Sequence, residues 1–156
     1  MHAKVDEALG YDSVPTAGAE HPLNRQLLAY WEKKRRSGGA LLRADFEPLD
    51  LPRILPGLFI AEPVGDDFRF RLAGSDVEAR MHRKVMGATL CELLGDRFAP
   101  RTIEIYRTVS LGDAPFVLRG HYLGDDLEHI DFEVLHLPME FVSGIRGVLG
   151  GQFAFD

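Results

Sequence analysis

Few side chains in this sequence have types and spacings that would support chemistry. It has one cysteine, Cys91, and its histidines are scattered, with His82 in the helical region and His121, His129 and His136 on adjacent predicted strands. A metal centre would need such side chains to converge, and acid–base catalysis would need a His–Asp pair directed into a pocket. The sequence contains no nucleophile motif, no metal-ligand spacing and no phosphate-binding loop. We therefore predict neither a metal site nor an enzyme, and keep a small α+β enzyme as the least favoured alternative.

The composition is that of an ordinary folded domain. The 156 residues suit one domain, with 46% hydrophobic and 27% charged side chains. One cysteine excludes an internal disulfide and fits a reducing compartment. The first residues lack the apolar core of a signal peptide, and no apolar run approaches the ~20 residues of a membrane span. We expect a cytoplasmic protein without a membrane partner.

Charge is unevenly distributed along the chain. The net charge of −6 argues against nucleic-acid binding, because phosphate recognition needs a basic surface. Residues 25–43 nevertheless hold six basic side chains and one acid, whereas residues 124–140 hold six acids and no Lys or Arg. A basic cluster at the end of a helix is explained by the helix dipole alone. A charged docking surface remains the alternative.

The first third of the sequence predicts an arm, a helix and a stiff connector. Residues 1–20 are small and polar and are expected to form a flexible N-terminal arm. Residues 21–57 form the next segment, in which a helix begins at Pro22 and ends at Gly38-Gly39. Its apolar residues recur at helical spacing (Leu23, Leu27, Leu28, Trp31). The connector that follows contains Pro48, Pro52 and Pro56.

Residues 58–156 are predicted to form the core of the domain. Strand-like runs cover residues 58–61, 68–73, 116–123, 130–137 and 145–155. Between them lie short helical pieces over 75–95 and a firmer helix from Pro100 to Gly112. This order predicts a two-layer α+β domain, with a five-stranded antiparallel sheet and helices on one face. The leading helix is expected outside this unit, on the opposite face of the sheet. Around Val134-Leu135 the alternation breaks, because residues that would face either side of the strand are apolar, which indicates a bulge or a sheet covered on both sides.

This order, with its motifs, resembles a family of small stand-alone PAS-domain proteins typical of alphaproteobacteria. The resemblance lies in the phrase YW…R…GG…R.DF.P.DLP..LP.LF, followed by RFRLAGS and Gly87. The matching positions are Tyr30, Trp31, Arg35, Gly38, Gly39, Arg43, Asp45, Phe46, Pro48, Leu51, Pro52, Leu55, Pro56, residues 69–74 and Gly87. The resemblance implies a sensory or signalling module that binds a small molecule or a protein partner. It also implies action in trans, because the sequence leaves no room for an output domain.

The cofactors of better-known PAS proteins are not indicated. Light-sensing members carry a reactive cysteine in the region of Cys91 and a glutamine on the last strand, where this chain has Gln152. Their Asn-Cys-Arg-Phe-Leu-Gln motif is absent here, so we expect Cys91 to be a small buried side chain rather than a flavin nucleophile. Haem-binding members draw a histidine from the long helix, but residues 100–111 contain none. The cofactor stays unassigned, with flavin and haem disfavoured.

Two hypotheses follow for the function. The first is ligand sensing, with a small apolar molecule held by Phe70, Leu72, Tyr106, Val109, Phe116, Leu118 and Phe132. In this hypothesis the Phe70 side chain faces the pocket, and the Arg69 and Arg71 side chains face away from it. The second is a ligand-free dimerisation or adaptor module that uses Leu23, Leu27, Tyr30 and Trp31 as its interface. A homodimer and a signalling protein partner are expected in either case.

Overall fold

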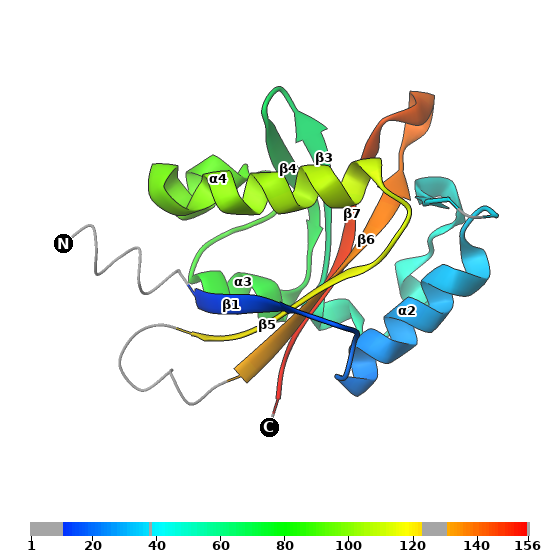
Figure 1. Ribbon diagram of the computed structural model, residues 1–156, viewed down its shortest axis with the longest axis horizontal. Coiled ribbons are helices and arrows are strands. Elements are labelled where there is room, and N and C mark those ends of the chain that lie inside the picture. The colour runs from blue at the N-terminus through cyan, green and yellow to red at the C-terminus, as the bar shows by residue number, and fades with distance from the viewer. Residues whose placement is uncertain (1–10, 38, 123–130, 156) are drawn as a thin grey trace.

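The computed structural model describes residues 11–37, 39–122 and 131–155, and these form a mixed α+β fold (Figure 1). The strands are β1 (Tyr11–Thr16), β2 (Leu41–Leu42), β3 (Leu58–Val64), β4 (Asp67–Ala73), β5 (Phe116–Tyr122), β6 (Asp131–Glu140) and β7 (Arg146–Ala154). The helices are α2 (Pro22–Lys34), α3 (Ser75–Met81) and α4 (Leu90–Leu111), and four short 3₁₀ turns complete the described elements.

The sheet is built around the five strands that the sequence predicts. Its order is β1-β5-β6-β7-β3-β4, antiparallel throughout, with the short β2 parallel to the end of β6. The sheet therefore has seven strands rather than five. The prediction of a flexible arm is wrong for Tyr11–Thr16, because this segment pairs with β5 as an edge strand. Residues 1–10 of that predicted arm lie outside the described residues.

Each face of the sheet carries its own hydrophobic core. The inner face is covered by α3 and α4, and the outer face by α2 and the connector. In Figure 1 α4 and α2 lie on either side of the crossing strands β6 and β7. Strand β6 is buried from Phe132 to Met139, because alternate side chains enter the two cores. The apolar residues of both parities around Val134-Leu135 thus reflect a sheet covered on both sides.

Helix α2 begins where its residues predict and ends a few residues earlier than they predict. His21 is its N-cap, with Nδ1 accepting the backbone N–H of Leu23 at 3.1 Å, and Pro22 occupies the first helical position. Lys33 and Lys34 lie in the last turn, where they face the negative end of the helix dipole. The basic cluster is therefore the end of a helix. The helix stops at Lys34, ahead of the predicted Gly38-Gly39, of which Gly38 lies outside the described residues.

Helix α4 is fixed at its start by two separate caps. Thr89 and Glu92 form a reciprocal capping box. The Asp67 carboxylate, at the start of β4, accepts the backbone N–H groups of Leu90 at 3.2 Å and Cys91 at 3.1 Å. Burial raises the pKa of Asp67, but the hydrogen bonds outweigh it, so the net pKa lies below its usual value. Gly95, with φ +75°, then breaks the helix as the sequence predicts.

Candidate functional site

The space between the sheet and the inner helices is almost filled. A cavity of about 50 Å³ remains there, enough for roughly one water molecule. It is bounded by aromatic and aliphatic side chains with a few polar groups (Phe59, Phe70, Val77, Arg80, Met81, Val85, Leu90, Leu93, Leu94, Thr102, Tyr106, Val134, His136, Gln152). A cavity of this size leaves no room for a flavin, a haem or another drug-sized molecule without movement of α3 or α4.

His136 is the buried titratable group of this inner cavity. Its side chain is 3% exposed, and its Nδ1 donates to the carbonyl oxygen of Phe116 at 3.0 Å, since a carbonyl can only accept. Burial lowers the pKa of His136 to about 4, so the ring is neutral near pH 7 with Nε2 as an acceptor. The Nδ1 partner is a main-chain carbonyl rather than a carboxylate. The described residues around this cavity therefore form no His–Asp pair of the kind that acid–base catalysis needs.

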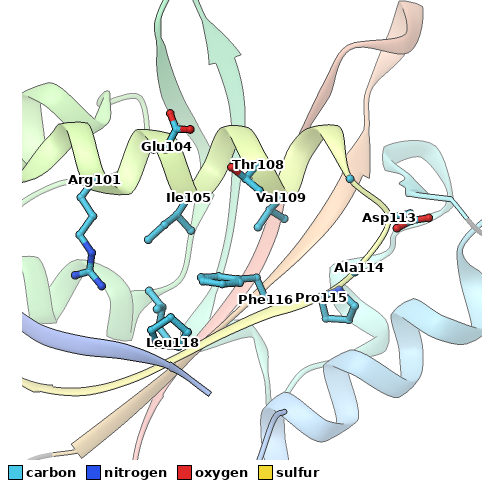
Figure 2. Close-up of a pocket in the computed structure, with 12 residues that line it drawn as sticks. Arg101, Glu104, Ile105, Thr108, Val109, Asp113, Ala114, Pro115, Phe116 and Leu118 are labelled. Carbon is cyan, nitrogen blue, oxygen red and sulfur yellow. The ribbon is translucent and has the colours of Figure 1, made fainter. Parts of the chain in front are cut away.

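A larger space lies beside α4, between this helix and β5 (Figure 2). This α4–β5 groove has a volume of about 600 Å³ and is open on one side. It is lined by Pro15 of β1, by Arg101, Glu104, Ile105, Thr108 and Val109 of α4, by residues 112–115, and by Phe116 and Leu118 of β5. Helix α4 packs over β4, β6 and β7, so the inner face of β5 is left beside the helix rather than beneath it.

The walls of the groove come from two regular elements. Ile105 and Val109 are one helical turn apart and both point from α4 toward β5 in Figure 2. Phe116 and Leu118 are two residues apart, so they share one face of β5 and project back toward the helix. The middle of the groove is therefore apolar, and its polar side chains lie near its two ends and rim.

The predicted pocket residues separate into four groups. Phe70 and Tyr106 bound the inner cavity, whereas Val109, Phe116 and Leu118 line the α4–β5 groove. Phe132 is fully buried in the inner core and lines neither space. The structure thus brings three of the seven predicted residues together at a space large enough for a ligand.

Leu72 is the fourth group, and its prediction as a pocket residue is wrong. The pairing of β3 with β4 shifts between Ile60 and Ala61, so that Ile60 faces Leu72 while Ala61 faces Phe70. Arg71 is the extra residue of this bulge and forms an ion pair with Glu62 at the surface. The bulge reverses the alternation, which places Leu72 against the outer core. Phe70 faces inward as predicted.

Two of the four residues predicted to form an interface are buried inside the protein instead. Leu27 and Trp31 are 0% and 1% exposed, because both pack onto the outer face of the sheet. The Trp31 indole donates its Nε1–H to the carbonyl oxygen of Pro138 at 3.0 Å. These side chains cover the sheet and cannot contact a second molecule while α2 is in place. Leu23 and Tyr30 are half-buried at the edge of the same core.

Cys91 is exposed, so the prediction of a buried side chain is wrong. It lies in the first turn of α4, on the side of the helix away from the core. A hydrogen bond with Asp67, together with the charge of that carboxylate, raises the pKa of the Cys91 thiol. A raised pKa favours the thiol over the reactive thiolate.

The role of Glu133 was not predicted from the sequence. Its alternation with Phe132 and Val134 predicts a solvent-facing acid, but its side chain is 0% exposed beneath the start of α2. The carboxylate accepts the backbone N–H of Glu20 at 2.7 Å, the backbone N–H of His21 at 3.1 Å and the Asn24 amide at 3.0 Å. An acid facing the N-terminus of a helix is stabilised by the helix dipole and by the free N–H groups there. Alternation places this acid only on the face of β6 opposite Phe132 and Val134, and the clue to its burial is the expectation that the leading helix covers that face.

Two structural features are absent from the described part of the chain. Its His, Cys, Asp and Glu side chains form no group of three that could hold a metal ion. Among residues 11–37, 39–122 and 131–155, no helix is both long and apolar enough to cross a membrane. His129, one of the histidines considered from the sequence, lies outside these ranges.

Comparison with known proteins assigns a family to most of the chain. The family model described as "PAS domain" matches residues 19–151. This range includes α2, the proline-rich connector, the inner helices and the strands from β2 to the greater part of β7, but not β1. No curated protein and no protein of solved structure matches the chain.

Proposed function

We propose that this chain, which belongs to the PAS-domain family, is a sensory module that binds a small apolar molecule in the α4–β5 groove. PAS domains are sensory and signalling modules rather than typical enzymes, and they commonly mediate dimerisation or partner binding. In our proposal the signal acts in trans, on a separate cytoplasmic protein. The finding that supports a ligand in this place is the difference in volume between the two spaces.

Of the two spaces that α4 borders, the α4–β5 groove is the one that fits a ligand. At about 600 Å³ it lies within the 300–1,000 Å³ typical of small-molecule sites, whereas the inner cavity of about 50 Å³ holds little more than water. Its apolar middle would be covered by an apolar ligand, and removing that surface from water favours binding. The ligand would contact α4 on one side and β1 and β5 on the other.

The position of α4 connects this groove to the rest of the molecule. Asp67 joins the start of the helix to β4, and Arg146 at the start of β7 donates to the carbonyl oxygen of Gly112 just after its end, at 2.6 Å. A ligand between α4 and β5 would favour one spacing of the two elements. Both ends of α4 would then transmit that change to the sheet. A shift in the position of α4 is the output that we propose.

A variant that fills the groove tests this proposal. Replacing Ile105 with Trp puts a bulky side chain between α4 and β5, while Ile145→Trp adds the same side chain at an exposed position outside the groove. Binding of an apolar fluorescent probe should weaken about tenfold in Ile105→Trp and stay unchanged in Ile145→Trp. Native mass spectrometry would show whether the purified protein retains a ligand. Equal probe binding by the two folded variants would refute the groove as the site.

A ligand-free adaptor is the second candidate, and one surface favours it. Leu111, Val142 and Ile145 are exposed apolar side chains. Leu111 and Ile145 are the chain neighbours of Gly112 and Arg146, which are joined by a hydrogen bond, and Val142 lies in the β6–β7 turn. Exposed apolar side chains near one another are typical of a protein contact, either with a second copy or with a signalling partner.

The adaptor proposal is tested by oligomeric state. If it holds, wild-type protein should be a dimer by light scattering, and Leu111→Asp together with Ile145→Asp should convert it to a monomer. The Ile105→Trp variant should leave that dimer intact. A wild-type protein that stays monomeric at high concentration and retains a ligand would reject the adaptor and keep the sensor.

A further inference from the structure

The α4–β5 groove has a cation at one end and an anion at the other. Figure 2 shows Arg101 directed from α4 toward β1 and Leu118, while Asp113 lies beyond the opposite end of the helix. The middle is lined by Ile105, Val109 and Phe116. We infer that the ligand of this groove is a linear amphiphile with an anionic head group, such as a carboxylate, bound by Arg101. This inference rests on the proposed function, since it specifies the ligand of the same site.

The Arg101 guanidinium is held in place by neutral partners. Its Nη1 donates to Ser13 Oγ at 3.3 Å and its Nη2 to the Ser13 carbonyl oxygen at 3.0 Å. Ser13 is itself buried in the pairing of β1 with β5, so these contacts fix the direction of the arginine. Neither contact neutralises the positive charge. The ion pairs among the described residues do not include Arg101.

Arg101 therefore retains both charge and hydrogen-bonding capacity at the groove. A guanidinium has five N–H groups, and the contacts with Ser13 use two of them. A planar carboxylate can accept two parallel N–H donors from a guanidinium. An arginine that is already oriented loses less side-chain entropy when a ligand binds, which increases the affinity.

The other charged groups of the groove set the orientation of the ligand. Glu104 forms an ion pair with Arg107 at 3.6 Å and points away from β5 in Figure 2, so it does not compensate Arg101. At the far end Asp113 is accompanied by two arginines, because Arg35 donates to the Asp113 carbonyl oxygen at 2.9 Å and Arg146 donates to that of Gly112. The head group should lie at Arg101, because Arg101 lines the groove whereas Arg35 and Arg146 do not. The tail should run along Ile105 and Val109 toward Pro115.

Three probes with the same chain and different head groups test this inference. Dodecanoate, dodecan-1-ol and dodecyltrimethylammonium would be titrated into the full chain below their micelle-forming concentrations, with binding followed by calorimetry. Dodecanoate should bind about tenfold more tightly than dodecan-1-ol, because it adds a charge-assisted hydrogen bond, and the cation should bind most weakly. Arg101→Gln should remove the preference for dodecanoate.

Matched variants separate charge from structure. Arg97→Gln removes a positive charge from α4 outside the groove and should leave dodecanoate binding unchanged. Ser13→Ala removes the Ser13 hydroxyl that Arg101 contacts but keeps the arginine, and should retain the preference for dodecanoate. If Arg101→Gln fails to fold, Arg101→Lys keeps the charge without the planar fork and should bind dodecanoate with intermediate affinity.

The outcomes distinguish this inference from the function on which it rests. Equal binding of the three probes, lost in Ile105→Trp, would overturn the anionic head group and preserve the groove as a ligand site. Tighter binding of the cation would overturn it in favour of recognition at Asp113. An equal loss of preference in Ser13→Ala and Arg101→Gln would also overturn it, because the position of β1 would then be the cause. Binding of no probe would count against both proposals.

Discussion

The two faces of the sheet differ in how completely they are filled. On the outer face, Leu27 and Trp31 of α2 are buried against β6 and β7, and Glu133 closes the remaining contact at the start of the helix. On the inner face, α4 covers β4, β6 and β7 but leaves β5 beside it, which opens the groove. In our proposal the outer face is the structural support and the inner face is where the ligand acts.

The two faces also differ in the polar side chain that each one buries and in its hydrogen-bond partners. The outer face buries a carboxylate whose partners are two backbone N–H groups and one amide, a set that requires α2 to stay docked. The inner face buries a neutral imidazole with one backbone partner. Substitutions on the outer face should therefore reduce stability. Substitutions along the groove should alter binding.

Removing Trp31 should produce the largest loss of stability. Trp31→Ala deletes a fully buried side chain and its hydrogen bond to Pro138, so the free energy of unfolding should fall by about 4 kcal/mol. Urea denaturation would measure the change. Trp31→Phe keeps most of the packing and should lose far less. A loss below about 1 kcal/mol for the alanine variant would show that α2 is not part of the cooperative fold.

Gly74 offers a test of backbone approach beneath the connector. Its φ is −69°, so a left-handed backbone is not the reason for a glycine here. A Cβ at this position would instead overlap the backbone carbonyl groups of Leu55 and Pro56. Gly74→Val should cost about 3 kcal/mol by overpacking, measured as a lower denaturation midpoint. Gly18→Ala has no neighbour within 4 Å and should be neutral, and equal stability of the two variants would reject the overlap.

The stability of the inner face should depend on pH through His136. Its folded pKa of about 4 lies below the unfolded value of 6.5, so the unfolded chain takes up the proton first as the pH falls. The contribution of the neutral His136 to the free energy of unfolding is complete above pH 6.5 and is lost as the pH falls from 6.5 to 4. The total loss is about 3 kcal/mol. His136→Gln keeps a donor for Phe116 but does not titrate. The free energy of unfolding should therefore change less with pH in the variant than in the wild type. The same pH dependence in both proteins would contradict a buried neutral His136 ring.

Glu133 should contribute the smallest of these effects. Glu133→Ala leaves the N–H groups of Glu20 and His21 without their acceptor, which should cost about 2 kcal/mol. Hydrogen exchange at those amides should accelerate, while binding in the groove is retained. Glu140→Ala, a substitution of an acid further along the same strand, is the matched control. Unchanged exchange at residues 20 and 21 would show that the carboxylate does not hold the start of α2.

Element order was predictable from the sequence, and membership of the PAS-domain family is confirmed. Helix starts and alternating strands are local properties of the chain, which is why α2 and β3 to β7 lie close to their predicted places. Helix α4 ends where it was predicted to end but begins at Leu90 rather than at Pro100. Pairing of polar Tyr11–Thr16 with β5 depends on contacts across more than 100 residues and has no local signal.

The candidate site was less predictable because it depends on single-residue geometry. The bulge at Arg71 moves Leu72 to the opposite face, an effect that simple alternation does not reveal. His136 shares its parity with Phe132 and Val134, so its inward position follows directly from alternation. The groove itself arises from the lateral position of α4 relative to β5, which no sequence pattern specifies.

The location of a bound amphiphile tests the central claim most directly. Methyl-labelled protein would be titrated with dodecanoate and followed by NMR. We predict that the methyl signals of Ile105, Val109 and Leu118 shift with a common saturation curve. The signals of Val77 and Val134, at the inner cavity, should change little. Shifts confined to Val77 and Val134 would place the ligand between the sheet and the inner helices and contradict the account.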